Sequence, residues 1–191
     1  MNPETCLIQR GDLAIRLMGD TPADYALMAG WLGDERVLAF YEGRDNSFSL
    51  ERVIEQYSPR VLRLADVTPC IVEQHGAPLG YIQYYPIDAQ TAAEYDLPTG
   101  DDTYGLDLFI GDPSAWNQGL GSRVVSLMCD YLFETLSARL LTIDPEAWNV
   151  RAIHCYEKCG FHKVKLLPAR ELHEGELRDC WLLTRGPAQP S

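Results

Sequence analysis

The segment that most constrains this chain is residues 149–161, NVRAIHCYEKCGF. Asn149 suits the N-cap of a helix, and Gly160 favours a left-handed stop after which Phe161 must return to a core. Ala152 and Tyr156 lie one turn apart on one face, and the small Ala152 allows a neighbouring segment to come close. The segment predicts a short capped helix carrying a carboxamide and a phenol. Taken alone, it is equally compatible with an ordinary helix and a core tyrosine.

A second motif lies upstream, in residues 112–123, DPSAWNQGLGSR. Gly119 and Gly121 leave backbone N–H groups unobstructed just before a long apolar helix at 124–136, and the helix dipole favours anions there. A single Gly-x-Gly is weak evidence, because glycines also end strands for steric reasons. Followed by the helix at Asn149, the motif indicates a site for the pyrophosphate of a nucleotide cofactor.

Together the two motifs resemble those of the GNAT superfamily of acetyl-CoA-dependent N-acetyltransferases, over residues 12–185. The phosphate loop of that family is Gln/Arg-x-x-Gly-x-Gly/Ala. Gly119 and Gly121 match it and Pro113 fits the family pattern, whereas Trp116 stands at the Gln/Arg position and Asn117 at a position that is often Gly. This departure affects one side-chain contact to the phosphates and not the contacts from the backbone.

The chain is more specifically similar to the aminoglycoside 6′-N-acetyltransferases. The Gly-x-Asp strand and the Asp-Pro before the Asn helix are not general to the superfamily. The segments that carry the likeness are TPCI (68–71), GYIQYY (80–85), YGLDLFIGDP (104–113), DP (144–145), NxRAIxxY (149–156), ELHEG (171–175) and DC (179–180). The resemblance implies transfer of an acetyl group from acetyl-CoA to an amine of a polycationic aminoglycoside, which confers antibiotic resistance.

The fold that this resemblance implies is the α/β (α+β) GNAT fold. It has a mixed, mostly antiparallel central sheet, splayed in the middle, with helices on both faces. Sequence patterns place strands at 13–18, 69–74, 79–85, 104–111, 139–143, 161–166 and 178–184 and helices at 21–32, 50–64, after 119 and from 149. Residues 37–48 and 86–102 are expected to be loops. The 191 residues are expected to form a single acetyltransferase domain with a core at about 12–185 and frayed termini.

Composition indicates the compartment in which the protein works and the state of its cysteines. No apolar run is long enough to span a bilayer and no signal layout opens the chain, so we expect a cytoplasmic protein. The six cysteines contain no Cys-x-x-Cys. Cys155 and Cys159 lie one helical turn apart but have no second pair of ligands nearby, so we expect reduced thiols and no metal.

Charge is distributed unevenly along the chain, whose net charge is −12. Residues 64–122 hold no Lys or Arg but contain Asp66, Glu73, Asp88, Glu94, Asp96, Asp101, Asp102, Asp107 and Asp112. Such a stretch is either a solvated face or a surface that attracts a polycation, such as an aminoglycoside or a polyamine, and repels nucleic acid and anionic membranes. Whether the protein is a monomer or a homodimer stays open.

Two residues are candidates for the chemistry. Asp107 interrupts an apolar strand, where a carboxylate is costly unless it meets a cation or a donor. The resemblance implies that it takes the proton of the attacking amine or orients that amine, although an outward-facing position on an edge strand is the alternative. Tyr156 would protonate the departing thiolate. A backbone N–H at about 109–111 would hold the thioester carbonyl.

The remaining candidates line the two halves of the expected site. Those for the cofactor are Phe109, Ile110, Gly111, Trp116, Gln118, Gly119, Leu120, Gly121, Ser122, Arg123, Asn149 and Tyr156. Those for the acceptor are the aromatic wall of Phe40 and Tyr41, with Gln83, Tyr85, Asp107, Asp144 and Asp179. Asn149 could equally serve as a bare helix cap, and Asp144 as part of a simple Asp-Pro turn. No role is assigned to any histidine.

Two other functions stay open. A polyamine or protein N-terminal acetyltransferase would share the cofactor half and differ only in the acceptor cleft. A non-catalytic acyl-CoA-binding module would use the same fold without turnover.

Overall fold

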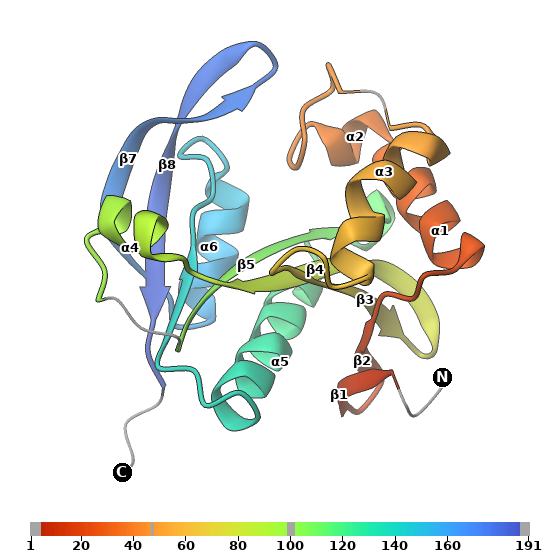
Figure 1. Ribbon diagram of the computed structural model, residues 1–191, viewed down its shortest axis with the longest axis horizontal. Helices are drawn as coiled ribbons and strands as arrows, with labels where there is room; N and C mark the ends of the chain where they lie inside the picture. The colour runs from red at the N-terminus through yellow and green to blue at the C-terminus, as the bar shows by residue number, and fades with distance from the viewer. Residues whose placement is uncertain (1–4, 47, 99–101, 188–191) are drawn as a thin grey trace.

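The computed structural model describes residues 5–46, 48–98 and 102–187. An eight-stranded sheet in the order β1-β2-β3-β4-β5-β6-β8-β7 forms its centre (Figure 1). The strands are β1 (Cys6–Arg10), β2 (Leu13–Leu17), β3 (Thr68–Gln74), β4 (Ala77–Pro86), β5 (Thr103–Ile110), β6 (Leu140–Ile143), β7 (His162–His173) and β8 (Glu176–Arg185). The helices are α1 (Pro22–Leu32), α2 (Glu35–Leu38), α3 (Leu50–Val61), α4 (Ala89–Tyr95), α5 (Leu120–Glu134) and α6 (Val150–Lys158), with a 3₁₀ turn, η1, at Pro113–Ala115.

The sheet opens between β5 and β6, which form its parallel pair. Their ladder holds only from Thr103 opposite Leu140 to Gly105 opposite Thr142. Beyond Gly105, β5 continues to Ile110 along β4 alone, whereas β6 ends at Ile143. The two strands therefore diverge, and the predicted splay of a mostly antiparallel GNAT sheet is confirmed.

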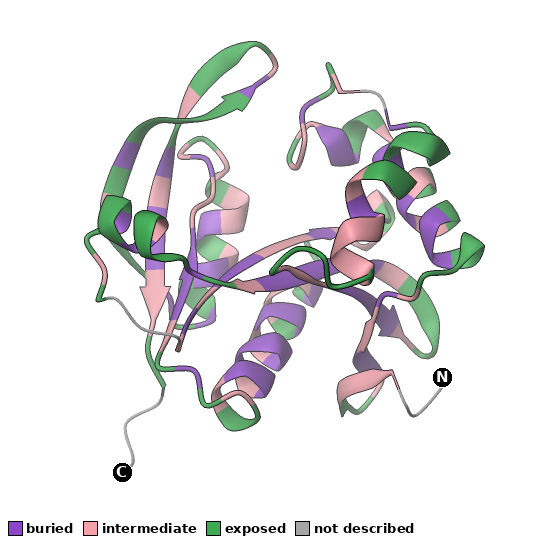
Figure 2. Cartoon of the chain, viewed as in Figure 1, coloured by how far each residue is buried: buried purple, intermediate pink, exposed green. Residues whose placement is uncertain are grey.

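Helices cover both faces of the sheet, as expected. Leu106 belongs to the core beneath α5. Phe109, three residues further along the same strand, belongs to the core beneath α1 and α3. This alternation follows from the period of two in a strand. Figure 2 shows the buried residues along the strands and on the sheet-facing side of α5. On the other side of the splay, α4 packs on β7 and β8 through Tyr95.

The expected helices begin near the residues that local signals indicate, but α3 ends at Val61 and α5 at Glu134, earlier than the expected 64 and 136. Thr21 accepts a hydrogen bond from the backbone N–H of Asp24 at the start of α1, and Pro22 occupies its first turn. The predicted hairpin between β3 and β4 turns through two residues with positive φ, His75 (51°) and Gly76 (77°).

The structure corrects three expectations about the elements. The strand at Leu13 is not the first, because β1 precedes it and pairs with it. The loops expected at 37–48 and 86–102 are interrupted by helix: α2 begins just ahead of the first, capped by Asp34, and α4, capped by Asp88, lies within the second. Residues 99–101 of the second loop and the tail at 188–191 lie outside the described residues.

Candidate active site

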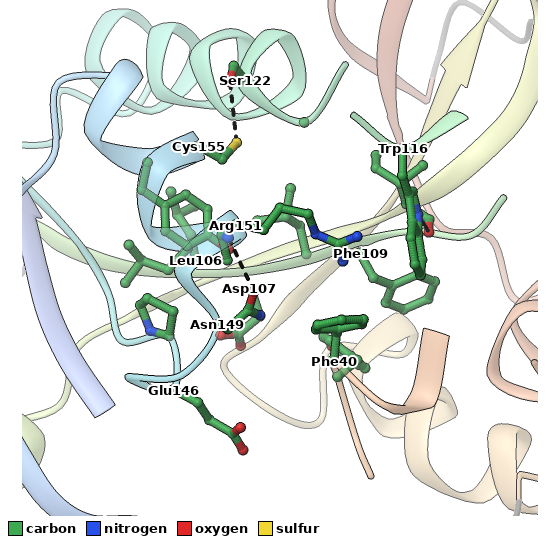
Figure 3. Close-up of a pocket in the computed structure, with 18 of the residues that line it drawn as sticks. Phe40, Leu106, Asp107, Phe109, Trp116, Ser122, Glu146, Asn149, Arg151 and Cys155 are labelled. Carbon is green, nitrogen blue, oxygen red and sulfur yellow. Dashed lines mark hydrogen bonds between the residues drawn. The ribbon is translucent and has the colours of Figure 1, made fainter. Parts of the chain in front are cut away.

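A cavity of about 820 Å³ lies where β5 and β6 diverge (Figure 3). Its walls come from β5, the loop that leads into α5, the first turns of α6 and the segment after α2. Of the predicted site residues, the cavity is lined by Phe40, Tyr41, Gln83, Asp107, Phe109, Ile110, Trp116, Gly119, Leu120, Gly121, Ser122, Asp144, Asn149 and Tyr156. The fold therefore brings most of the candidates to one place.

The wall at the start of α5 is suited to an anion. Gly119 is the N-cap residue with a φ of 75°, and no side chain caps the helix, so the first N–H groups of α5 remain available. Gly121 also lines the cavity, and a Cβ there would lie 3.3 Å from Sγ of Cys155. Glycine at 121 thus lets α5 and α6 approach each other, and Ser122 Oγ lies 3.4 Å from the same sulfur (Figure 3).

Tyr156 lies on α6 beneath this wall. Its side chain is 8% exposed, and burial raises the pKa of its phenol well above the ordinary value. Within the described residues its hydroxyl has no hydrogen-bond partner, although it lines the cavity. Asn149 accepts a hydrogen bond from the Ala152 N–H at 3.2 Å and so caps α6, which leaves its amide nitrogen for another partner.

The backbone of β5 presents alternate N–H groups to the cavity. Gly111 donates its N–H to the Leu79 carbonyl, and Ile87 donates its N–H to the Thr103 carbonyl, so the odd-numbered residues of β5 bond to β4. In an antiparallel ladder the residues between them point the other way. The N–H of Ile110 therefore faces the splay, whereas the N–H groups of Phe109 and Gly111 face β4. Of the backbone N–H groups at 109–111 that were predicted to bind the thioester carbonyl, the one that faces the splay is therefore that of Ile110.

Asp107 projects into the cavity from the middle of β5 and is half-buried. Gln83 Nε2 donates to its Oδ2 at 2.6 Å, and the Tyr85 hydroxyl lies 3.5 Å from its Oδ1. Burial raises the pKa of Asp107 to about 6, opposed by the hydrogen bond from Gln83 and reinforced by the charge of Asp144. A carboxyl with this pKa is a carboxylate near neutrality and a competent proton acceptor.

Four further carboxylates line the same cavity as Asp107. They belong to Glu42, Asp144, Glu146 and Glu171. Burial raises the pKa of Asp144, while the Tyr95 hydroxyl donates to it at 2.7 Å and Arg170 lies 3.6 Å away. Desolvation and the neighbouring carboxylates raise the pKa of Glu171 to about 7. This side of the cavity therefore concentrates negative charge and suits a ligand with several ammonium groups.

Two contacts join the segment after α2 to segments on the other side of the splay. Arg44, after α2, forms an ion pair of 2.5 Å with Glu174 in the β7–β8 turn. The ring centroids of Phe40 and Trp148 are 5.3 Å apart, and Trp148 lies just ahead of α6. The acceptor half is thus enclosed by segments that are far apart in the sequence.

Five of the predicted site residues do not line the cavity. Gly111 faces the ring of Trp31, Gln118 donates to the Ser114 carbonyl, and Arg123 pairs with Asp12 on the turn after β1. The exposed Asp179 uses its carboxylate to accept the Ala169 N–H at 2.8 Å, and Tyr85 contacts Asp107 without lining the cavity. The side chains of Gln118, Arg123 and Asp179 already have protein partners, which explains why they do not reach the cavity.

Most of the acidic residues of the stretch at 64–122 do not line the cavity. Glu73, Glu94, Asp96 and Asp102 form ion pairs with basic residues from other parts of the chain, and Asp88 and Asp112 cap helical turns. Asp107 is the member of the stretch that lines the cavity, and Asp101 lies outside the described residues. The carboxylates gathered around Asp107 come from elsewhere in the sequence.

Several residues that line the cavity were not predicted from the sequence. Glu171 lies in the ELHEG segment that carried the family resemblance, so a signal for it existed. Glu42, Glu146 and Arg151 had no distinguishing local pattern, and only the tertiary fold brings them to the cavity.

Comparison with known proteins places the chain in a class. The chain belongs to the GNAT acetyltransferase family, because the sequence profile of the acetyltransferase (GNAT) domain matches residues 20–168. The uncapped start of α5, the unpartnered Tyr156 hydroxyl and the splay beside them fit the acetyl-CoA that this family uses.

Particular relatives share most of the chain. It is 32% identical over 151 residues to aminoglycoside N(6′)-acetyltransferase type 1 of Klebsiella pneumoniae, covering 79% of this chain and 74% of the relative. The crystal structure of aminoglycoside acetyltransferase AAC(6′)-Ib with coenzyme A and kanamycin superposes with a TM-score of 0.76 at 28% identity, covering 91% of this chain and 94% of that one. The spermidine N-acetyltransferase of Vibrio cholerae, at 16% identity and a TM-score of 0.74, shares the fold.

The described residues contain no group of three or more His, Cys, Asp or Glu side chains arranged to hold a metal ion. Across the same part of the chain, every helix is too short or too polar to cross a membrane.

Proposed function

We propose that this protein is an aminoglycoside 6′-N-acetyltransferase that uses acetyl-CoA and so confers antibiotic resistance. The observation that carries the proposal is the position of Asp107. Its half-buried carboxylate shares one cavity with the uncapped start of α5 and with four further carboxylates, those of Glu42, Asp144, Glu146 and Glu171. One side of the cavity thus suits the phosphates of the cofactor, and the other side suits a polycation that carries the amine to be acetylated.

Asp107 and Tyr156 divide the proton transfers between them. Acetyl-CoA supplies an acetyl group activated as a thioester. Asp107 accepts a proton from the acceptor's ammonium group, directly or through water, because only a free amine attacks a carbonyl. The Ile110 N–H donates to the carbonyl oxygen as negative charge develops on it. Tyr156 then gives its phenolic proton to the sulfur that leaves, an assignment supported by its lack of a protein partner.

The acceptor side distinguishes an aminoglycoside from a smaller amine. Phe40 and Tyr41 line the same cavity as the carboxylates, and Phe40 is 39% exposed. Aromatic rings beside several carboxylates suit sugar rings that carry ammonium groups. The same charge opposes nucleic acid, whose phosphates would face these carboxylates.

Two further assignments belong to this proposal. We infer that the whole chain acts as one acetyltransferase domain with its core at about 12–185. We also infer that it works in the cytoplasm, which is consistent with its six free thiols.

The test is acetyl-CoA turnover, followed by release of free thiol. The acceptors are two aminoglycosides that differ only in an amine or a hydroxyl at the 6′ position, together with spermidine and a model peptide. The proposal expects rapid turnover of the 6′-amino compound and little of its hydroxyl partner. Turnover of spermidine or the peptide alone would overturn the acceptor assignment and leave the acetyl-CoA assignment standing.

A further inference from the structure

We propose that Arg151 binds the pyrophosphate of coenzyme A and supplies the side-chain contact that Trp116 cannot make. The inference rests on the acetyl-CoA dependence in the proposed function and is independent of which acceptor is used. The GNAT loop pattern places Gln or Arg at the position of Trp116, whose indole offers a single N–H donor and no charge. A side-chain contact to the phosphates at this point would therefore come from another element.

Arg151 occupies the corresponding space. Its guanidinium carbon lies 4.3 Å from the ring centroid of Trp116 and 4.3 Å from that of Phe40. Figure 3 shows the side chain extending from α6 towards these two rings. The Trp116 ring is itself fixed, because its Nε1 donates to the Ile110 carbonyl at 2.9 Å. Attraction between the cation and the ring faces holds the guanidinium in place before any ligand arrives.

Among the described residues, the positive charge of Arg151 has no acidic partner. Eight other arginines form ion pairs: Arg10, Arg16, Arg36, Arg44, Arg123, Arg139, Arg170 and Arg178. Across residues 5–46, 48–98 and 102–187, no carboxylate pairs with Arg151 and no acceptor receives its N–H donors, while burial lowers its pKa. In a chain with a net charge of −12, a partly desolvated cation without a carboxylate indicates an anionic ligand.

The location selects the pyrophosphate as that ligand. Arg151 lines the same cavity as Gly119, Gly121 and Ser122 at the uncapped start of α5, and it lies in the first turn of α6. Helix N-termini bind phosphates through backbone N–H groups, and a guanidinium adds paired charge-assisted hydrogen bonds to the phosphate oxygens. Backbone donors from α5 and side-chain donors from α6 would then hold one group from two sides.

The test measures binding without an acceptor, by calorimetry or competition. The probes are coenzyme A, dephospho-coenzyme A, which lacks the 3′-phosphate, and pantetheine, which lacks every phosphate. The variants are Arg151→Met and Arg151→Lys. Arg52→Met is the matched control, because the Arg52 guanidinium lies 4.9 Å from the Phe48 ring and outside the cavity.

Arg151→Met is expected to weaken both coenzyme A and dephospho-coenzyme A about 10-fold or more, the scale of one charge-assisted hydrogen bond, and to leave pantetheine unchanged. Arg151→Lys is expected to lose less, and Arg52→Met nothing. In an Arg151→Met background, Trp116→Arg is expected to restore part of the affinity.

Three results would overturn the proposal. Unchanged affinity for coenzyme A would exclude a phosphate contact. Equal loss for all three probes would indicate that Arg151 only ties Phe40 and Trp116 together. Loss for coenzyme A but not for dephospho-coenzyme A would assign the contact to the 3′-phosphate.

Discussion

Gln83 and Asp107 face each other across the β4–β5 ladder, and Gln83 Nε2 donates a hydrogen bond of 2.6 Å to Asp107 Oδ2. The Gln83 amide cannot reverse, because Arg60 Nη1 and the Tyr81 hydroxyl both donate to its Oε1 at 2.7 Å. This arrangement fixes one oxygen of Asp107. Its other oxygen keeps only a long contact of 3.5 Å to Tyr85.

Replacing Gln83 should therefore change how Asp107 titrates. The hydrogen bond from Gln83 lowers the pKa of Asp107, so Gln83→Met should move the acidic limb of kcat/KM above pH 6 and reduce turnover at neutral pH. Gln74→Met is the control, because Gln74 donates to Asp12 far from the cavity. An unmoved limb in the Gln83 variant would show that another group controls it.

Tyr156→Phe should lower kcat by roughly 10- to 10⁴-fold, the range for a lost general acid. Affinity for coenzyme A and the unfolding temperature should stay unchanged, because the hydroxyl has no protein partner. Calorimetry and thermal unfolding would check these two points. Full activity in the Phe variant would remove Tyr156 from the mechanism and point to water as the acid.

The carboxylates around Asp107 should affect acceptor binding more than chemistry. Asp144→Asn and Glu171→Gln should each raise the acceptor KM by about 10-fold with a smaller change in kcat. The effect of Asp144 should be the smaller, because Arg170 and Tyr95 already contact it. Asp179→Asn is the matched control outside the cavity, and an equal KM increase there would contradict the assigned acceptor side.

Asp107 should also cost stability when it is charged. Its pKa is raised in the folded state to about 6, so the folded protein loses stability as pH rises from the unfolded pKa, near 4, through 6. Asp107→Asn should stabilise the protein at pH 8 by no more than about 3 kcal/mol, and the difference should shrink at pH 5. Urea unfolding at the two pH values would check this. A variant that is less stable at pH 8 would contradict the burial argument.

Much of the fold could be predicted from local chemistry. The Thr21 cap, the His75-Gly76 turn and the Asn149 cap each specify a boundary through groups a few residues apart. The strand β1 was not predicted because its five residues, none of them fully buried, show no clear alternation of apolar and polar positions. The seven-residue α4 was missed because its segment is mostly exposed, although Asp88 and Thr91 carry a cap signal.

The site was less predictable, because it depends on tertiary geometry. Asp107 was found because a carboxylate interrupts an apolar strand. The predicted Asp179 does not line the cavity, whereas Glu171 does. Strand β7 is irregular between Leu167 and Glu171, where Ala169 has a φ of 49° and donates its N–H to the Asp179 carboxylate. Bulges redirect side chains in this way and leave no clear trace in sequence.

The most direct test of the account is kcat/KM for a 6′-amino aminoglycoside between pH 5 and pH 9, in the wild type and in Asp107→Asn. Asp107 must be ionised to accept a proton, so the wild type should show an activity that rises with pH through about 6. The Asn variant should lose about 10²-fold or more near neutrality, and its profile should lack that limb. An Asn variant with wild-type activity and an unchanged limb near pH 6 would contradict the role of Asp107.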